Sequence, residues 1–216
     1  MQLQIAPSLL AADFLHLEKD VQMLNKEADI IHLDVMDGTL VPNISFGFSV
    51  LDPLSKIATI PMDAHLMVVN PQKWFDNLHK DGVQMVSFHL EAAQENTAEY
   101  IDRLHAMGIK AGVAINPDMP VENLFPYIGK ADYFLIMSVF AGFGGQKFIP
   151  EALDRIARLK KEIVAKGNDA LIEVDGGVNL ENIGALKQAG ATMIVAGSTV
   201  FKSAEPGKTI AALRGV

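Results

Sequence analysis

Short apolar segments alternate with longer amphipathic segments along the whole chain. Apolar runs rich in β-branched residues predict strands near 3–7, 30–35, 62–67, 84–89, 110–115, 132–138, 170–174 and 192–196. Amphipathic spacing predicts helices near 13–27, 47–57, 71–80, 94–106, 120–126, 150–165, 180–188 and 204–213. Each strand–helix unit takes about 27 residues, close to the smallest size of a parallel strand–helix–strand repeat.

Eight such units indicate an α/β fold, a single (β/α)8 TIM barrel that occupies residues 1–216 as one domain. No linker, low-complexity segment or block of like charges divides the chain. A doubly wound open sheet would need a glycine-rich turn after the first strand. Here that turn reads Ala6-Pro7-Ser8-Leu9-Leu10, so we set this alternative aside.

The second predicted strand is the first to carry candidate chemistry. Successive side chains of a strand point to opposite faces, so His32, Asp34 and Met36 share one face while the other face is apolar. In the third strand His65 and Met67 are in phase in the same way. This distribution fits a barrel wall whose apolar outer face packs under helices and whose inner face is reactive.

Active sites of barrels lie at the C-terminal ends of the strands. Four metal-capable side chains fall there and predict one cluster: His32, Asp34, His65 and Asp175. Imidazole and carboxylate ligands suit one divalent cation, Zn²⁺, Fe²⁺, Mn²⁺ or Co²⁺. The chain has no cysteine, so thiolate ligands and disulfides are excluded. A lone strand histidine is usually a hydrogen-bonded core residue, but four such side chains at three strand ends favour the metal site.

Asp34 and Asp175 come from strands two and seven, which lie roughly opposite each other in a ring of eight. Carboxylates on opposite faces of a substrate can remove a proton from one side and return one from the other, which inverts a stereocentre. A metal on the neighbouring carbonyl oxygen would stabilise the enediolate. The alternative is that both residues are ligands only, or strand-end turn formers.

Three consecutive strand ends are rich in glycine, which predicts a phosphate-binding site at the strand 6–8 loops. Backbone N–H groups in these loops form the usual phosphate cradle of a barrel and require no basic side chain. The candidate substrate-binding residues are Gly142, Phe143, Gly144, Gly145, Gly176, Gly177, Gly197 and Ser198, together with Ser8 at the end of strand one. The loop 140–148 is expected to act as a mobile lid, with a rigid glycine turn as the alternative.

Met36, Met67 and Met137 lie at or near strand ends and predict an apolar cap that excludes water around a flat enediolate. Core filling is the simpler interpretation of any methionine. His89 is expected to be a hydrogen-bonded core residue. The remaining histidines fall on predicted helices and are expected to face solvent: His16, His79 and His105.

Charge and termini narrow the choice of partners. The formal net charge is −8 over 216 residues, which argues against nucleic acid and anionic membranes as partners. The N-terminus lacks a secretory pattern, and no stretch is apolar enough to span a bilayer. We expect a soluble, cytoplasmic homo-oligomer whose partner is a small phosphorylated molecule.

Several of these motifs, in this order and spacing, resemble the ribulose-phosphate 3-epimerase family. The matching segments are Ala6-Pro7-Ser8, His32-Leu33-Asp34-Val35-Met36-Asp37-Gly38, Val41-Pro42-Asn43, His65-Leu66-Met67-Val68, Gly142-Phe143-Gly144-Gly145-Gln146, Val174-Asp175-Gly176-Gly177 and Ala196-Gly197-Ser198. The resemblance implies interconversion of D-ribulose 5-phosphate and D-xylulose 5-phosphate in the pentose phosphate pathway. It implies one divalent metal on the four-residue cluster, with Asp34 as proton acceptor and Asp175 as donor. It also implies that His65 and the glycine loops contact the substrate.

Two departures from the family pattern flank the expected substrate mouth. Thr39-Leu40 stands where the family usually has His-Phe, and Phe140-Ala141 stands where it usually has Asn-Pro. They leave open an epimerase of a longer ketose phosphate such as allulose 6-phosphate. A non-catalytic sugar-phosphate-binding barrel would not need both aspartates. A decarboxylase of the orotidine-phosphate kind would need an Asp-x-Lys-x-x-Asp strand end, but Met36 stands at the lysine position.

Overall fold

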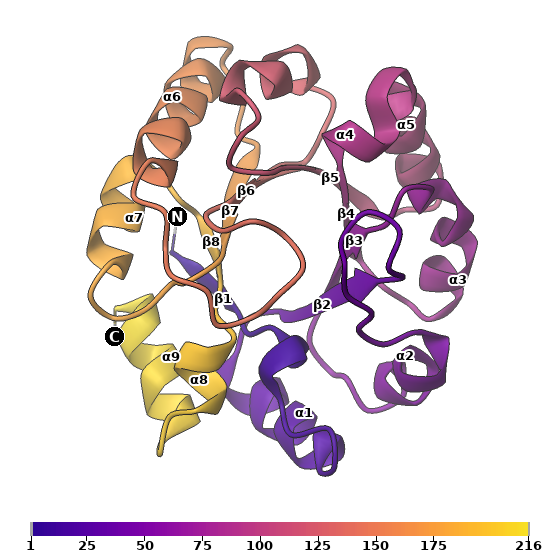
Figure 1. The fold of residues 1–216 in the computed structure, drawn as a ribbon, viewed down its shortest axis with the longest axis vertical. Coiled ribbons are helices and arrows are strands. Elements are labelled where there is room, and N and C mark those ends of the chain that lie inside the picture. The colour runs from indigo at the N-terminus through magenta and orange to yellow at the C-terminus, as the bar shows by residue number, and fades with distance from the viewer. Residues whose placement is uncertain (1, 216) are drawn as a thin grey trace.

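The computed structural model describes residues 2–215, in which eight parallel strands curl into a barrel (Figure 1). The strands are β1 Gln4–Ala6, β2 Ile31–Met36, β3 Met62–Met67, β4 Met85–His89, β5 Lys110–Ile115, β6 Tyr133–Met137, β7 Leu171–Asp175 and β8 Met193–Val195. They pair in chain order from β2 to β8, and β8 pairs with β1. The predicted TIM-barrel fold is confirmed.

The barrel is least tightly paired between β1 and β2. There the two strands share only an isolated bridge between Ser8 and His32. The N–H of His32 donates a hydrogen bond of 3.1 Å to the carbonyl of Pro7. This seam therefore lies next to two of the candidate site residues.

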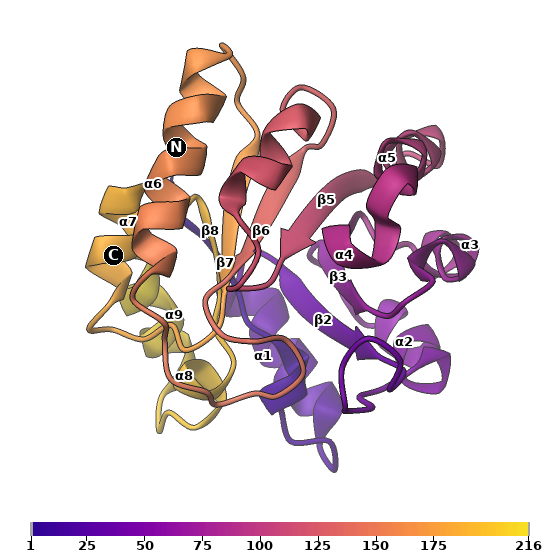
Figure 2. The ribbon, with the colours of Figure 1, turned by 45° about the horizontal axis from the view of Figure 1, so that its top comes forward.

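Helices surround the barrel and cover the outer face of the strands (Figures 1 and 2). They are α1 Leu17–Glu27, α2 Phe48–Ser55, α3 Phe75–Lys80, α4 Leu90–Ala93, α5 Thr97–Ala106, α6 Ala152–Ala165, α7 Ile183–Ala189, α8 Ser198–Phe201 and α9 Pro206–Arg214. Each buries its apolar positions against the strands, as Ile156 and Leu159 of α6 do. Within residues 2–215, no helix has the length and apolar character needed to cross a membrane.

The structure corrects some of the predicted helices. The segment predicted as a helix at 120–126 is a 3₁₀ helix, Val121–Tyr127, with Pro120 before it and Pro126 inside it. Proline lacks the N–H that an α-helix requires, which accounts for the tighter turn. The helix predicted over 94–106 begins at Thr97, after a 3₁₀ turn over Gln94–Asn96. Two four-residue helices, α4 and α8, were not predicted.

The inside of the barrel contains one large side chain whose position depends on a neighbouring glycine. Tyr133 of β6 is fully buried, and its ring lies against Gly112 of β5. A Cβ atom at position 112 would lie 2.3 Å from Cζ of that ring, a separation that atoms do not tolerate. The absence of a side chain at Gly112 therefore allows the tyrosine ring into the barrel.

Candidate active site

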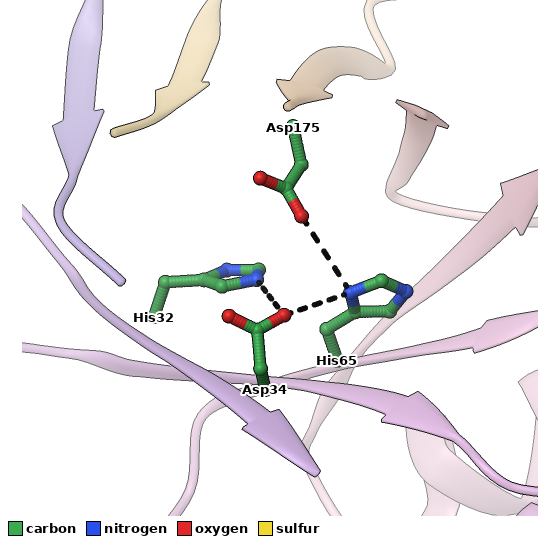
Figure 3. A group of neighbouring side chains, drawn as sticks. All are labelled: His32, Asp34, His65 and Asp175. Carbon is green, nitrogen blue, oxygen red and sulfur yellow. Dashed lines mark hydrogen bonds and ion pairs between the residues drawn. The ribbon is translucent and has the colours of Figure 1, made fainter. Parts of the chain in front are cut away.

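Four side chains from three strands converge at one end of the barrel (Figure 3). The pairing of β2 with β3 sets Asp34 opposite His65, and β7 brings Asp175 to the same point. Oδ1 of Asp34 lies 3.5 Å from Nε2 of His32 and 3.3 Å from Nδ1 of His65. Oδ2 of Asp175 lies 4.0 Å from Nδ1 of His65. The structure thus assembles the four residues that the sequence predicted as one cluster.

The donor atoms of this cluster fit a divalent cation. One nitrogen or oxygen from each of the four residues lies within 4.8 Å of the others. Nε2 of His32 is buried without a hydrogen-bond partner, while its Nδ1 lies 2.8 Å from Oδ2 of Asp63. A histidine held by a carboxylate through one nitrogen, with the other nitrogen free, is the usual arrangement of a metal ligand. Two imidazoles and two carboxylates match the ligands of Zn²⁺ and related ions.

A second layer of polar side chains lies beneath this cluster, and sequence reasoning missed it. The hydroxyl of Tyr133 donates a hydrogen bond of 2.6 Å to Oδ1 of Asp63. Oε1 of Glu173 lies 3.4 Å from Nδ1 of His32. Asp63 and Glu173 stand two residues before His65 and Asp175, so they face inward by the same strand alternation. That alternation was the available signal.

Burial and charge set the ionisation of the buried groups. Burial raises the pKa of Glu173 well above its usual range, and the charge of Asp63 adds to this. Burial also raises the pKa of Tyr133, again with help from Asp63, so the phenol keeps the proton that it donates. Burial lowers the pKa of His32, but the charge of Asp34 and the contacts with Asp34, Asp63 and Glu173 together outweigh it and leave that pKa well above its usual value. The centre therefore attracts positive charge.

The two aspartates have opposite pKa shifts. Burial raises the pKa of Asp34, but the charge of His32 and the close contacts of this carboxylate with the His32 and His65 rings outweigh it and hold that pKa well below its usual range. Burial, followed by the charge of Asp34, raises the pKa of Asp175 to about 7. Asp34 is therefore a carboxylate at neutral pH, and Asp175 exchanges its proton there. Two carboxyl groups with separated pKa values can serve as base and acid in one reaction.

A cavity lies directly above the cluster. Its lining includes most of the residues that the sequence proposed for substrate and cap: Ser8, Asp34, Met36, Met67, Met137, Gly142, Phe143, Gly144, Gly145, Asp175, Gly176, Gly177, Gly197 and Ser198. His32 and His65 are fully buried and do not line it. The cavity therefore exposes the two carboxylates while the imidazoles remain beneath.

Ser8 contacts one of these carboxylates. Its hydroxyl donates a hydrogen bond to Oδ2 of Asp34, and it accepts one of 3.2 Å from the N–H of Leu10. Ser8 is buried at the seam between β1 and β2. The serine thus connects the first strand to the proton-accepting candidate on the second.

The methionines occupy two apolar clusters around the mouth. Met36 and Met67 pack with Val41, and Leu40 and Ala141 lie against the same cluster. Met137 belongs to a second cluster with Ala114, Leu135 and Val139. Two of the residues that depart from the family pattern, Leu40 and Ala141, therefore border the apolar cap.

The loop between β6 and α6 extends over the mouth of the barrel (Figure 1). The amide of Gln146 donates to the carbonyls of Phe140 and Phe143, at 2.7 and 2.8 Å. Asn43, in the loop after β2, donates a hydrogen bond of 2.7 Å to the carbonyl of Gly142. Half of the Phe143 side chain is exposed. These bonds hold the loop beside the cavity, while its predicted mobility as a lid stays a prediction.

The other histidines lie as expected, with one addition. His89 is fully buried and its Nε2 lies 2.9 Å from Nε2 of His65, a contact that the sequence did not predict. His16, His79 and His105 lie at the surface. His89 therefore belongs to the surroundings of the site.

The fold and this centre define a class of protein, a (β/α)8 barrel with paired carboxylates and imidazoles beneath a glycine-lined cavity. The chain belongs to the ribulose-phosphate 3 epimerase family, whose model matches residues 4–201. It is 40% identical over 215 residues to "Ribulose-phosphate 3-epimerase, cytoplasmic isoform" of Oryza sativa subsp. japonica, covering 98% of this chain and 92% of that protein. It is 41% identical over 210 residues to a ribulose-phosphate 3-epimerase of Mycobacterium bovis, covering 97% and 91%.

A solved structure supports the fold independently. The crystal structure of a 3-hexulose-6-phosphate synthase superimposes with a TM-score of 0.69 at 20% identity, over 99% of this chain and 98% of that one. At this identity the likeness concerns the fold alone. Family membership therefore rests on the sequence matches over nearly the whole chain.

Proposed function

We propose that this chain is an epimerase that interconverts D-ribulose 5-phosphate and D-xylulose 5-phosphate, using the single barrel formed by residues 1–216. One observation carries the proposal: Asp34 and Asp175 reach the same cavity from different sides of the barrel, with pKa values shifted in opposite directions. The relatives at about 40% identity are named ribulose-phosphate 3-epimerases, which is the name of this activity. Epimerisation needs two proton-transfer groups on opposite faces of one carbon, which this pair supplies.

The proton transfers follow from the two carboxyl groups. Asp34, ionised at neutral pH, removes the C3 proton of ribulose 5-phosphate on one face, and Asp175 donates a proton on the other. In the reverse direction their roles exchange. Ser8 holds Asp34 through its hydrogen bond to Oδ2. The methionine cap keeps water away from the planar enediolate of the substrate.

His32, Asp34, His65 and Asp175 are the residues that would hold one divalent cation. When bound, a Zn²⁺, Fe²⁺, Mn²⁺ or Co²⁺ ion would supply Lewis-acid stabilisation of negative charge on the substrate oxygens. The choice among these ions stays a prediction. Metal analysis of the purified protein, together with activity in chelator, tests the requirement.

The loops after β6, β7 and β8 are proposed to bind the phosphate group. Gly197 and Ser198 line the cavity from β8 and α8, and Gly176 and Gly177 line it from β7. A Cβ at Gly177 would lie 2.5 Å from the backbone nitrogen of Phe148, so only glycine permits this close backbone packing. Backbone N–H donors accommodate a dianion in a protein whose net charge is negative.

The experiment that tests the proposal compares two substrates. Ribulose 5-phosphate and allulose 6-phosphate are supplied side by side to the metal-loaded protein, and product is measured by coupled assay or NMR. Conversion of ribulose 5-phosphate to xylulose 5-phosphate with the higher kcat/KM is expected. Preference for the hexulose phosphate would place this chain in the alternative activity, and binding without conversion would make it a non-catalytic barrel.

Location and assembly extend the proposal. The name of the rice relative supports a cytoplasmic location. The homo-oligomer expected from the sequence stays a prediction, and light scattering of the purified protein would measure its mass. The small phosphorylated ketose is proposed as the partner, with no role for nucleic acid.

A further inference from the structure

A row of hydrogen-bonded side chains runs from His65 to the loop after β6. Apart from His65, its side chains have no role in the proposed reaction: His89, Glu91 and Asn116. Nε2 of His65 lies 2.9 Å from Nε2 of His89, and Nδ1 of His89 lies 2.8 Å from Oε1 of Glu91. The amide nitrogen of Asn116 donates to the same Oε1 at 2.6 Å. The amide oxygen of Asn116 accepts the N–H of Ala141 at 3.0 Å. These contacts form a continuous row from His65 to Ala141, in which Oε1 of Glu91 is shared by His89 and Asn116.

The direction of donation in this row follows from the chemistry of each group. A carboxylate oxygen only accepts, so Nδ1 of His89 carries the hydrogen that it donates to Glu91. A neutral imidazole protonated at Nδ1 has a bare Nε2, so Nε2 of His89 accepts from Nε2–H of His65. The lone pair of His65 is then on Nδ1, the nitrogen that faces Asp34 and Asp175. The opposite tautomer, in which Nδ1–H donates to Asp34, uses the longer contact, 3.3 Å against 2.9 Å, and would leave two bare Nε2 atoms facing each other.

We propose that His89 and Glu91 are positioning residues that fix the tautomer of His65, so that its Nδ1 lone pair is presented to the divalent cation. The inference rests on the proposed function for the identity of the centre. With the reverse tautomer, Nδ1 of His65 would carry hydrogen and would be unable to bind a metal ion. Outer partners of this kind typically contribute 10- to 100-fold in metal affinity.

Burial makes this control effective. His65 and His89 are both fully buried, and their rings stack with centroids 5.0 Å apart and planes 20° apart. Water cannot supply an alternative acceptor to a group that solvent does not reach. His89 faces inward because it lies two residues after the buried Ser87 on β4, in the same phase.

The far end of the row contains one of the two departures from the family pattern. Ala141 stands where the family usually has proline, and proline has no N–H to donate to Asn116. The backbone oxygen of Asn116 also accepts from Nη2 of Arg155 at 2.7 Å. Asn116 is thus held from two sides, with its amide nitrogen directed at Glu91. The tautomer of His65 is thereby connected to the first residues of the loop over the cavity.

The test uses the full chain and measures tautomers and metal affinity separately. In metal-free protein labelled with ¹⁵N in histidine, NMR should show His65 protonated at Nε2 and His89 at Nδ1. His89→Leu removes the acceptor and is expected to weaken Co²⁺ binding 10- to 100-fold. His89→Gln, whose amide oxygen can accept from His65, should restore most of that affinity. His105→Leu, a surface histidine that also pairs with an aspartate, serves as the matched control.

Each outcome decides the inference. A His65 protonated at Nδ1 in the metal-free wild type, or Co²⁺ affinity in His89→Leu equal to that of His105→Leu, would overturn it. If His89→Leu does not fold, Glu91→Gln replaces it, since loss of the carboxylate frees His89 to reverse its tautomer and should also weaken Co²⁺ binding. The wild-type assay on ribulose 5-phosphate judges the proposed function separately, because tautomer and affinity are measured without substrate.

Discussion

Tyr133 and His32 hold opposite sides of one carboxylate: the phenol donates to Oδ1 of Asp63 at 2.6 Å, and Nδ1 of His32 lies 2.8 Å from its Oδ2. None of these three side chains is exposed to solvent. The orientation of a candidate metal ligand on β2 therefore depends on a ring that comes from β6.

Replacing the phenol tests this dependence. Tyr133→Phe leaves Oδ1 of Asp63 without its donor inside the barrel, which typically costs about 1–3 kcal/mol of folding free energy. We expect a lower midpoint in urea denaturation and weaker Co²⁺ binding. Tyr127→Phe, a change at a partly exposed ring in the 3₁₀ helix, is the matched control. Equal stability of the two variants would show that this hydrogen bond contributes nothing.

The pH dependence of metal binding should report Asp175. Metal ligands must lose their protons, so the affinity of the metal-free protein rises with pH. Below its raised pKa, His32 carries a proton that metal binding displaces. Below about pH 7, Asp175 carries a second proton that metal binding also displaces. The slope of log K against pH should therefore be about one unit steeper below pH 7 than above it. Isothermal titration in several buffers measures this, and an unchanged slope in wild type would contradict the raised pKa.

The two carboxyl groups should separate exchange from epimerisation. Each positioned acid or base is typically worth about 10²–10⁴ in rate, so Asp175→Asn should lose at least that much epimerase activity. If Asp34 is the base for ribulose 5-phosphate, this variant in D₂O still exchanges the C3 hydrogen but forms almost no xylulose 5-phosphate. Metal content is measured alongside, and Asp169→Asn at an exposed site is the control. Normal epimerisation by Asp175→Asn would exclude it as the second acid.

A negative charge in the proposed phosphate cradle should repel the substrate. Ser198→Asp places a carboxylate among the glycine loops, so we expect KM for ribulose 5-phosphate to rise at least tenfold, or about 1.4 kcal/mol. Metal content should be unchanged, because Ser198 is not among the four clustered ligands. Ser49→Asp introduces the same charge at an exposed position on α2. Steady-state kinetics of both variants measure this effect. Equal KM values would show that the substrate phosphate does not bind at these loops.

The sequence predicted the barrel and its reactive end because strand alternation is a local property. His32 and Asp34, two residues apart, share a face in any strand, and the same holds for His65 and Met67. Helix starts were harder to place. The segment 13–16 forms a turn in which Asp13 accepts a hydrogen bond from the N–H of Leu15, so α1 begins only at Leu17.

Contacts between distant strands were beyond the sequence. Asn116 reads as a turn former before Pro117, yet its side chain bridges Glu91 and Ala141, each 25 residues away. Strand alternation turns Asp63 inward but does not reveal its partner, Nδ1 of His32 on the neighbouring strand, at 2.8 Å. Such roles depend on how neighbouring strands are staggered, and no local pattern encodes that.

The pairing of Gly112 with Tyr133 has an evolutionary consequence. Because a Cβ at position 112 would collide with the ring, a side chain can be added at 112 only if the residue at 133 becomes smaller. A homologue with any larger residue at 112 is expected to have a smaller one at 133, and would then lack the phenol that donates to Asp63. Covariation between these two columns of an alignment would therefore distinguish two groups of barrels. In one group a tyrosine at 133 holds Asp63, which in turn orients His32; in the other, a different donor holds Asp63.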